Sequence, residues 1–151
     1  MAVRSAGSPS SASIVGLNIK TAVRAATTAT LASSPTYSNG VLTAGSSTSL
    51  AAQDGVSLAV GERLLVKDQS SSLQNGIYSV TSLGLSWFSP YVLTRSGDMD
   101  TWSEVPSSVC IVQEGSTLAD TSWLCTSNEG GTLGSTAISF ARFGSPTSLW
   151  T

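Results

Sequence analysis

Histidine is absent from the chain of 151 residues. Because histidine is the commonest general base in enzymes and a frequent zinc ligand, its absence excludes Ser-His-Asp and Cys-His catalysis and any zinc site built on imidazole. The many serines lack a G-x-S-x-G motif, and the glycine-rich pieces lack the spacing and lysine of a phosphate loop. We therefore expect a protein that is not an enzyme and that binds no cofactor.

Charge is also scarce, since Asp, Glu, Lys and Arg make up 11% of the residues, against about 25% in an average soluble domain. The 7 basic residues are scattered and the net charge is -2, so no basic cluster exists that could neutralise phosphates. No apolar run approaches the roughly 20 residues of a membrane span. The composition predicts neither a nucleic-acid partner nor a membrane partner.

The two cysteines, Cys110 and Cys125, each lie in an apolar, strand-like run. Buried cysteine packs as a small hydrophobic residue, so we expect two free thiols in the core. A disulfide would require the two strands to be neighbours. The N-terminus lacks the apolar core of about 7 to 15 residues found in secretory signals, and synthesis in the cytoplasm is expected.

Apolar positions are filled mainly by Val, Ile, Leu and aromatic residues between Gly, Asn, Asp, Ser and Pro, which is typical of β-strands. We predict an all-β fold, a single compact sandwich-like or barrel-like domain of short antiparallel strands with extended N- and C-terminal arms. The predicted strands cover residues 22–26, 62–67, 76–83, 91–95, 108–113, 122–126 and 137–143.

The segment 61–80, GERLLVKDQSSSLQNGIYSV, gives the clearest local prediction. It has a strand, a polar stretch ending in Asn75-Gly76, and a second strand, so it predicts a β-hairpin with a tight Asn-Gly turn. A single helical turn is predicted at residues 101–105, where Asp100 or Thr101 would cap the start and Pro106 would end it.

The chain divides into an N-terminal arm (1–20), a β domain (21–144) and a C-terminal tail (145–151), with a Ser/Thr/Gly-rich insertion at 31–49. The arms and the insertion have no clear period. Segments of this kind bury too little surface to become ordered alone, so we expect the arms to dock on neighbouring chains. The alternative for the tail is a cap on its own core. The interface candidates are Ile14, Val15, Leu17, Ile19, Leu149 and Trp150.

Two further clusters are candidate sites. Oxygens of Asp98, Asp100 and Glu104 could hold a cation such as calcium, and the alternative is a solvated loop. Trp87, Tyr91 and Trp102 could stack on a glycan, and the alternative is packing in the core.

Two basic residues at strand ends, Lys67 and Arg95, are predicted to solubilise edges or to pair with Asp68 or Asp98 rather than to bind a ligand.

Between Thr21 and Phe143 the chain resembles a module of tailed-bacteriophage virion proteins, especially tail fibres and related appendages. The residues that carry the resemblance occur in order as VRAATT (23–28), GERLLVKDQ (61–69), NGIY (75–78), LTRSGDMD (93–100), EGST (114–117), ADTSW (119–123) and LGSTAI (133–138). The chain departs from the module at 31–49, which is longer and richer in serine, and at 83–91, which carries an extra Ser-Trp-Phe-Ser-Pro. These departures are where contacts specific to this protein are expected.

The resemblance implies a structural protein of the virion, of tail-fibre or appendage type, without catalytic residues. It would be made in the host cytoplasm, form a homotrimer and have other virion proteins as partners. Two alternatives remain open at this point. One is a head decoration or cement protein that stabilises the capsid, and the other is a receptor-binding module that recognises host glycan.

Overall fold

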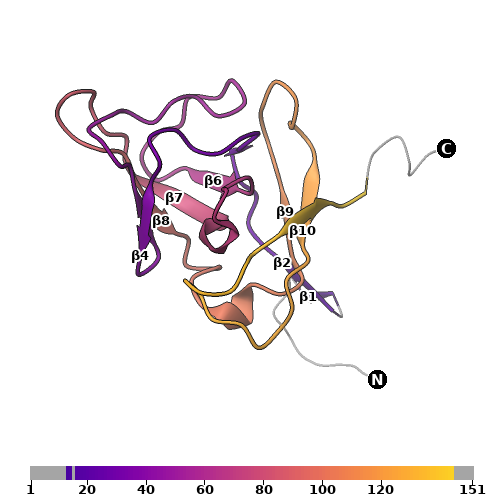
Figure 1. Cartoon of the computed structure of the whole chain (residues 1–151). Helices are drawn as coiled ribbons and strands as arrows, with labels where there is room; N and C mark the ends of the chain where they lie inside the picture. Colours follow the sequence, from indigo (N-terminus) through magenta and orange to yellow (C-terminus); the bar gives the residue numbers. More distant parts are fainter. Residues whose placement is uncertain (1–12, 15, 145–151) are drawn as a thin grey trace.

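The fold is all-β, as predicted, and consists of two mixed sheets (Figure 1). The computed structural model describes residues 13–14 and 16–144. Within this part of the chain the helical structure consists of short 3-10 turns, and no helix is long and apolar enough to cross a membrane.

The six-stranded sheet has the order β3-β6-β7-β8-β5-β4. Its central pair, β6 and β7, is the predicted hairpin, and it joins antiparallel with Val66 opposite Gly76. The strands are β3 (Ala25–Ala26), β4 (Thr36–Ser38), β5 (Val41–Thr43), β6 (Arg63–Val66), β7 (Gly76–Ser82) and β8 (Val92–Arg95).

The five-stranded sheet has the order β1-β2-β9-β10-β11. It lies beside the six-stranded sheet in Figure 1. Its strands are β1 (Ser13–Ile14), β2 (Leu17–Ile19), β9 (Ser108–Ile111), β10 (Ser122–Cys125) and β11 (Phe140–Arg142). Both β1 and β2 belong to the predicted arm 1–20, so part of that arm is paired within the sheet.

The prediction of purely antiparallel strands is wrong at two places. Strand β2 pairs parallel with β9, and β3 pairs parallel with β6. Each of these pairs joins segments that are far apart in the sequence, and a long connection allows the parallel direction that a hairpin forbids. The remaining pairs between strands are antiparallel.

The tight Asn-Gly turn lies at a different place from the predicted one. Asn75 has an extended backbone (φ -65°, ψ 157°) and Gly76 already belongs to β7. Residues 67–75 connect β6 to β7 and contain the 3-10 turn η2 (Ser72–Gln74). The left-handed Asn-Gly pair is Asn39-Gly40, with φ of 49° and 83°, which joins β4 to β5 as hairpin turns of this type do. The stretch 31–49 therefore contributes two strands to the sheet.

Two buried clusters lie on opposite faces of the six-stranded sheet, and they cover both faces at β3, β6 and the start of β7. Side chains alternate between faces along a strand, so Leu64 and Leu65 enter different clusters, and both are fully buried. The first cluster lies under the loops that follow β5 and includes Leu42, Val56 and Tyr78. The second contains Leu65 and Ile77 of this sheet and, from the other sheet, Cys110 and Cys125.

Three local predictions are confirmed. Each of the seven predicted strand segments contains a strand. The single helical turn is η3 (Trp102–Glu104), which Thr101 and Glu104 close with a reciprocal capping box. Cys110 and Cys125 are buried free thiols on adjacent strands, and burial raises the pKa of Cys110 to about 12.

Candidate functional site

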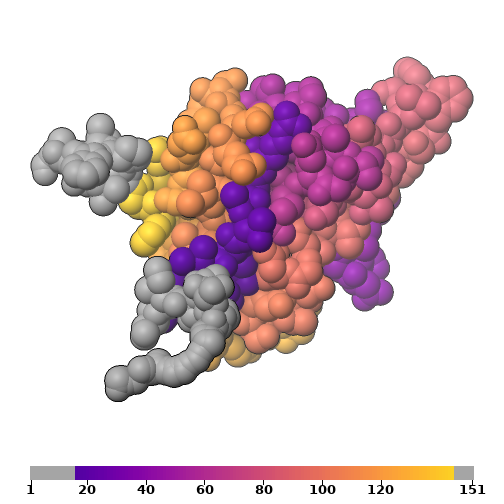
Figure 2. Space-filling model, turned by 180° about the vertical axis from the view of Figure 1, so that it is seen from behind, coloured from indigo at the N-terminus to yellow at the C-terminus, as the bar shows by residue number. Residues whose placement is uncertain are grey.

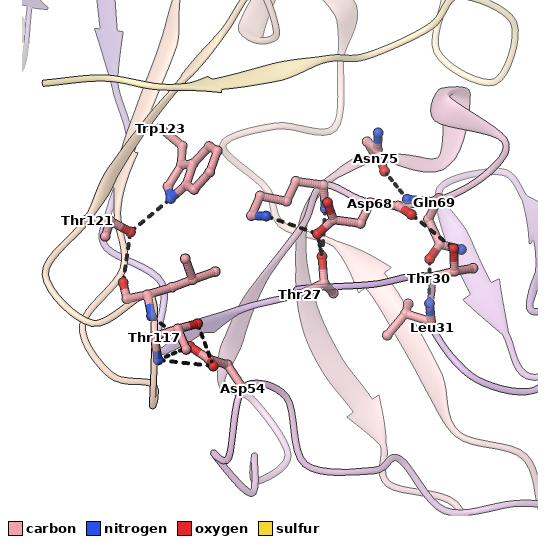
Figure 3. Close-up of polar contacts among 12 residues, drawn as sticks. Thr27, Thr30, Leu31, Asp54, Asp68, Gln69, Asn75, Thr117, Thr121 and Trp123 are labelled. Carbon is pink, nitrogen blue, oxygen red and sulfur yellow. Dashed lines mark hydrogen bonds and ion pairs between the residues drawn. The ribbon is translucent and has the colours of Figure 1, made fainter.

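Polar side chains of segment 61–80 form hydrogen bonds with other parts of the domain. The backbone N–H of Gln69 donates to Asn75 Oδ1 at 3.0 Å, and Asn75 Nδ2 donates to the carbonyl of Ile138 at 2.9 Å. The backbone N–H of Leu31 donates to Gln69 Oε1 at 2.8 Å (Figure 3). Both Gln69 and Asn75 are buried, so this part of the motif braces the domain and offers no open binding group.

The neighbouring charges of the motif are also paired. Lys67 Nζ lies 3.0 Å from Asp68 Oδ2 and 4.4 Å from the ring centroid of Trp123. The hydroxyl of Thr27 donates to Asp68 Oδ2 at 2.8 Å. The predicted pairing of Lys67 with Asp68 is confirmed, and the contact with Trp123 ties the end of β6 to β10 of the other sheet.

Asp54 fastens a second pair of distant loops. Its carboxylate accepts the backbone N–H groups of Thr117 and Leu118, with the bond to Leu118 at 2.8 Å, and it also accepts the Thr117 hydroxyl at 2.9 Å (Figure 3). Burial raises the pKa of Asp54, but these hydrogen bonds outweigh it and leave the pKa below its ordinary value. The hydrogen-bond donors of Thr117 and Leu118 are therefore already bound by the Asp54 carboxylate.

The structure does not bring together the three residues considered for a cation site, Asp98, Asp100 and Glu104. Arg63 binds both carboxylate oxygens of Asp98, at 3.1 and 2.9 Å. Glu104 Oε1 accepts the backbone N–H groups of Asp100 and Thr101 in the capping box. Among the described residues no group of three His, Cys, Asp or Glu side chains gathers around a common point. Two of the three carboxylates, those of Asp98 and Glu104, are engaged by nearby donors instead.

Arg95 is buried, whereas the sequence predicted a solubilising edge residue or a partner of Asp98. Its side chain donates to the Tyr37 hydroxyl and to the carbonyls of Leu73 and Asn75, each at 2.9 Å. Its guanidinium lies 5.0 and 5.1 Å from the ring centroids of Tyr37 and Tyr78. Arg95 also borders a surface cavity of about 600 Å³. These contacts give the guanidinium a structural task, because it joins β8 to the connection before β7.

The three aromatic residues considered for glycan binding do not form one surface. Trp87 is 89% exposed, whereas Tyr91 is fully buried and donates its hydroxyl proton to the carbonyl of Ala32. Trp102 is half-buried and donates its indole N–H to the carbonyl of Asn128. The three residues therefore do not form one glycan-binding face, because Tyr91 and Trp102 pack within the domain, as the alternative of core packing expected for them.

A projecting connection between β7 and β8 is the most exposed apolar feature among the described residues. Leu85, Trp87 and Phe88 have exposed fractions of 59%, 89% and 77%. Figure 2 shows this segment, coloured pink, as the lobe at the upper right. From the sequence, Trp87 is a candidate for glycan binding, and the extra Ser-Trp-Phe-Ser-Pro within 83–91 is a place where contacts specific to this protein are expected. The sequence does not single out Leu85.

The outer face of the five-stranded sheet is a second apolar surface. Ile19, Val109, Leu124 and Ala141 lie opposite one another across four strands and therefore share a face. Ile19 and Ala141 are exposed, Leu124 is half-buried and Val109 is buried, at 7% exposed. None of the four belongs to either core cluster, because the alternate residues of β9 and β10 point into the core. Ile111 lies on the same face and is 52% exposed.

The interface candidates fall partly on this sheet. Ile19 is 37% exposed on the outer face and Leu17 is half-buried, and both belong to β2. Ile14 lies in β1, opposite Leu17. Val15, Leu149 and Trp150 lie outside the described residues.

Comparison of the chain with protein-family models, with curated proteins and with solved structures finds no match.

Proposed function

We propose that this chain is a non-enzymatic structural protein of a tailed-phage virion, of tail-fibre or appendage type. It acts as a homotrimer that is anchored to other virion proteins. The ordered resemblance between Thr21 and Phe143 supports the class of assembly. The surface of the domain supports a role in contact-making, because most of its exposed large apolar residues lie on or next to the five-stranded sheet and on one projecting connection, with Val60 as the exception.

The observation that carries the proposal is the arrangement around the five-stranded sheet. Its outer face has an apolar row across β2, β9, β10 and β11, and its two edge strands are β1 and β11. The N-terminal segment leads into β1 and the C-terminal segment follows β11. An edge strand offers unpaired backbone groups to another chain. One partner surface can therefore contact the apolar row together with an edge strand of the sheet.

The chemistry of the described residues supports a non-enzymatic role. Burial raises the pKa of the Cys110 and Cys125 thiols, which keeps both protonated and weakly nucleophilic at neutral pH. The carboxylates of Asp54 and Asp98 are bound to groups of the chain itself.

The first test is the presence and position of the chain on the particle. Mass spectrometry of purified virions should detect it in a fixed ratio to the other structural proteins. Labelled-antibody electron microscopy of intact particles should place it on the tail or its appendages. Label on the head would favour the decoration or cement alternative, and absence from purified virions would refute the proposal.

A second test concerns the terminal anchors. Trp150→Ala should lower the occupancy of the chain on the particle, because a buried tryptophan contributes about 150 to 250 Å² to an interface. Ser148→Ala in the same tail is the matched control and should keep full occupancy. Equal occupancy of both variants would remove the tail from the anchoring contact.

A further inference from the structure

The connection between β7 and β8 exposes several large apolar side chains to solvent. We define the tip as residues 85–88, with the sequence Leu-Ser-Trp-Phe. Its three apolar side chains are each more than half exposed. Scattered exposed apolar residues are normal in soluble proteins, but a contiguous group of large ones marks a contact surface.

The tip is held in a defined conformation. The backbone N–H groups of Phe88 and Ser89 donate to the carbonyl of Leu85 at 2.8 and 2.9 Å, and the N–H of Leu85 donates to Ser89. Trp87 has a left-handed backbone (φ 74°), which is uncommon for a bulky residue. Its N–H is bonded to the carbonyl of Ser47 in the neighbouring loop. The tip is therefore ordered before it meets a partner, which lowers the entropic cost of binding.

Gly84 fixes the base of the tip against that neighbouring loop. Its φ is 73°, and a side chain at this position would collide with the carbonyl of Thr48 and the backbone N of Tyr91. The N–H of Leu50 donates to the carbonyl of Leu83 close by. Two loops from separate parts of the chain thus support one projecting group.

Charge is missing from both loops and from the strands beside them. No Asp, Glu, Lys or Arg occurs at residues 25–53 or at residues 69–94. These stretches include β4, β5 and β7 and nearly all of β8. Beside Trp87, a hollow of about 470 Å³ is lined by Ser46, Ser47, Thr48 and Ser86. The tip therefore has an apolar centre with a hydroxyl rim, the anatomy of a protein contact with a tryptophan at its centre.

We propose that the tip is the self-association contact of the chain, at which Trp87 and Phe88 of three copies meet around the threefold axis. In a symmetric oligomer, residues near the axis face their own copies. A charged group there would meet an identical charge, and such like-charge contacts cost several kcal/mol. An uncharged end with apolar residues at its centre is suited to this position. The occupant of the surface is thus a second and a third copy of this chain.

The inference deepens the proposed function and rests on it for the trimeric state. It also divides the contacts between two surfaces. The tip joins copies of the chain to one another, and the outer face of the five-stranded sheet, with the terminal segments, remains for other virion proteins. A variant can therefore disturb one contact without disturbing the other.

The experiment is sedimentation velocity of the purified full chain over a concentration series. The wild type should sediment as a trimer, and the double variant Trp87→Ser with Phe88→Ser should sediment as a monomer. Ile111→Ser removes an exposed apolar side chain from the other surface and should remain trimeric. Far-UV circular dichroism should be the same for all three chains, because the tip lies outside both buried clusters.

Three outcomes would overturn the inference. A wild-type chain that is monomeric at every concentration has no self-contact, and a double variant that remains trimeric uses another surface. A monomeric chain that binds neutral glycans or phosphatidylcholine vesicles through Trp87 has a different occupant. A chain that trimerises through the tip but is absent from virions would refute the proposed function alone. Conversely, a monomer found in virions would refute the inference and the homotrimer, but not the structural role in the virion.

Discussion

The two sheets differ in how many of their faces are covered. The six-stranded sheet is buried on both faces at β3, at β6 and at the start of β7, and the consecutive residues Leu64, Leu65 and Val66 of β6 are all fully buried. The five-stranded sheet buries the face that carries Cys110 and leaves Ile111 of the same strand 52% exposed. Strands β3 and β6 therefore contribute side chains to the core from both faces, whereas the five-stranded sheet contributes them from one face and leaves the other as the surface that we propose for contacts.

The largest effect should follow from a cavity in the six-stranded sheet. Leu65→Ala removes a fully buried side chain of β6 and should lower the free energy of unfolding by about 2 to 5 kcal/mol. Urea unfolding followed by circular dichroism measures the change. Ile111→Ala in the five-stranded sheet is the contrasting variant and should change the same quantity by only about 0.5 kcal/mol. Equal losses at the two positions would contradict the division between the sheets.

An intermediate effect should follow from removing the polar brace beside β7. Asn75→Ala leaves the N–H of Gln69 and the carbonyl of Ile138 without their buried partner. The free energy of unfolding should fall by about 1 to 3 kcal/mol. Ser70→Ala, at an exposed position of the same connection, should change it by no more than about 0.5 kcal/mol. An unchanged free energy of unfolding in Asn75→Ala would show that these hydrogen bonds contribute little to stability.

The smallest effect should appear as a pH dependence at Asp54, on the surface where the two loops meet. Its pKa in the folded chain is below the ordinary value of 3.8 because of the hydrogen bonds from Thr117 and Leu118. Its contribution to stability is therefore complete above pH 3.8 and is lost as the pH falls through the lower folded pKa.

The measurement compares the unfolding free energies of the wild type and Asp54→Asn as a function of pH. The difference between the two chains should be constant near neutral pH and should shrink in acid. A difference that grows as the pH falls would mean that folding raises the pKa of the Asp54 carboxyl instead of lowering it. An NMR titration of the Asp54 carboxyl checks the direction of the pKa shift independently.

Much of the fold could be predicted because strand-forming residues and their breaks are local features. All seven predicted strand segments and the capped turn at Trp102 are present. The strands β4 and β5 were missed because their serine- and threonine-rich sequence has no periodicity, although Asn39-Gly40 was a usable turn signal. Asn75-Gly76 misled the prediction, because Asn75 serves as a buried hydrogen-bonding residue rather than as part of a turn.

The candidate sites could be predicted less well, because a site depends on which distant groups meet. Arg63 reaches Asp98 and thereby removes it from the metal candidate, and no local pattern indicates that pair. Tyr91 and Trp87 are close in the sequence, yet one is buried and the other almost fully exposed. Trp87 lies in the projecting connection whereas Tyr91 directly precedes β8, and spacing in the sequence does not reveal that difference.

By itself, the sequence determined the all-β class, the hairpin at 61–80, the burial of both cysteines and the lack of charge along two long stretches. These properties depend on residue type and on neighbours along the chain. Only the tertiary structure decided that β2 and β3 pair in parallel with distant strands, that Arg95 is buried and that Trp87 projects. Those outcomes depend on long-range pairing, in which each buried polar group must find a partner and each apolar row must find a cover or remain exposed.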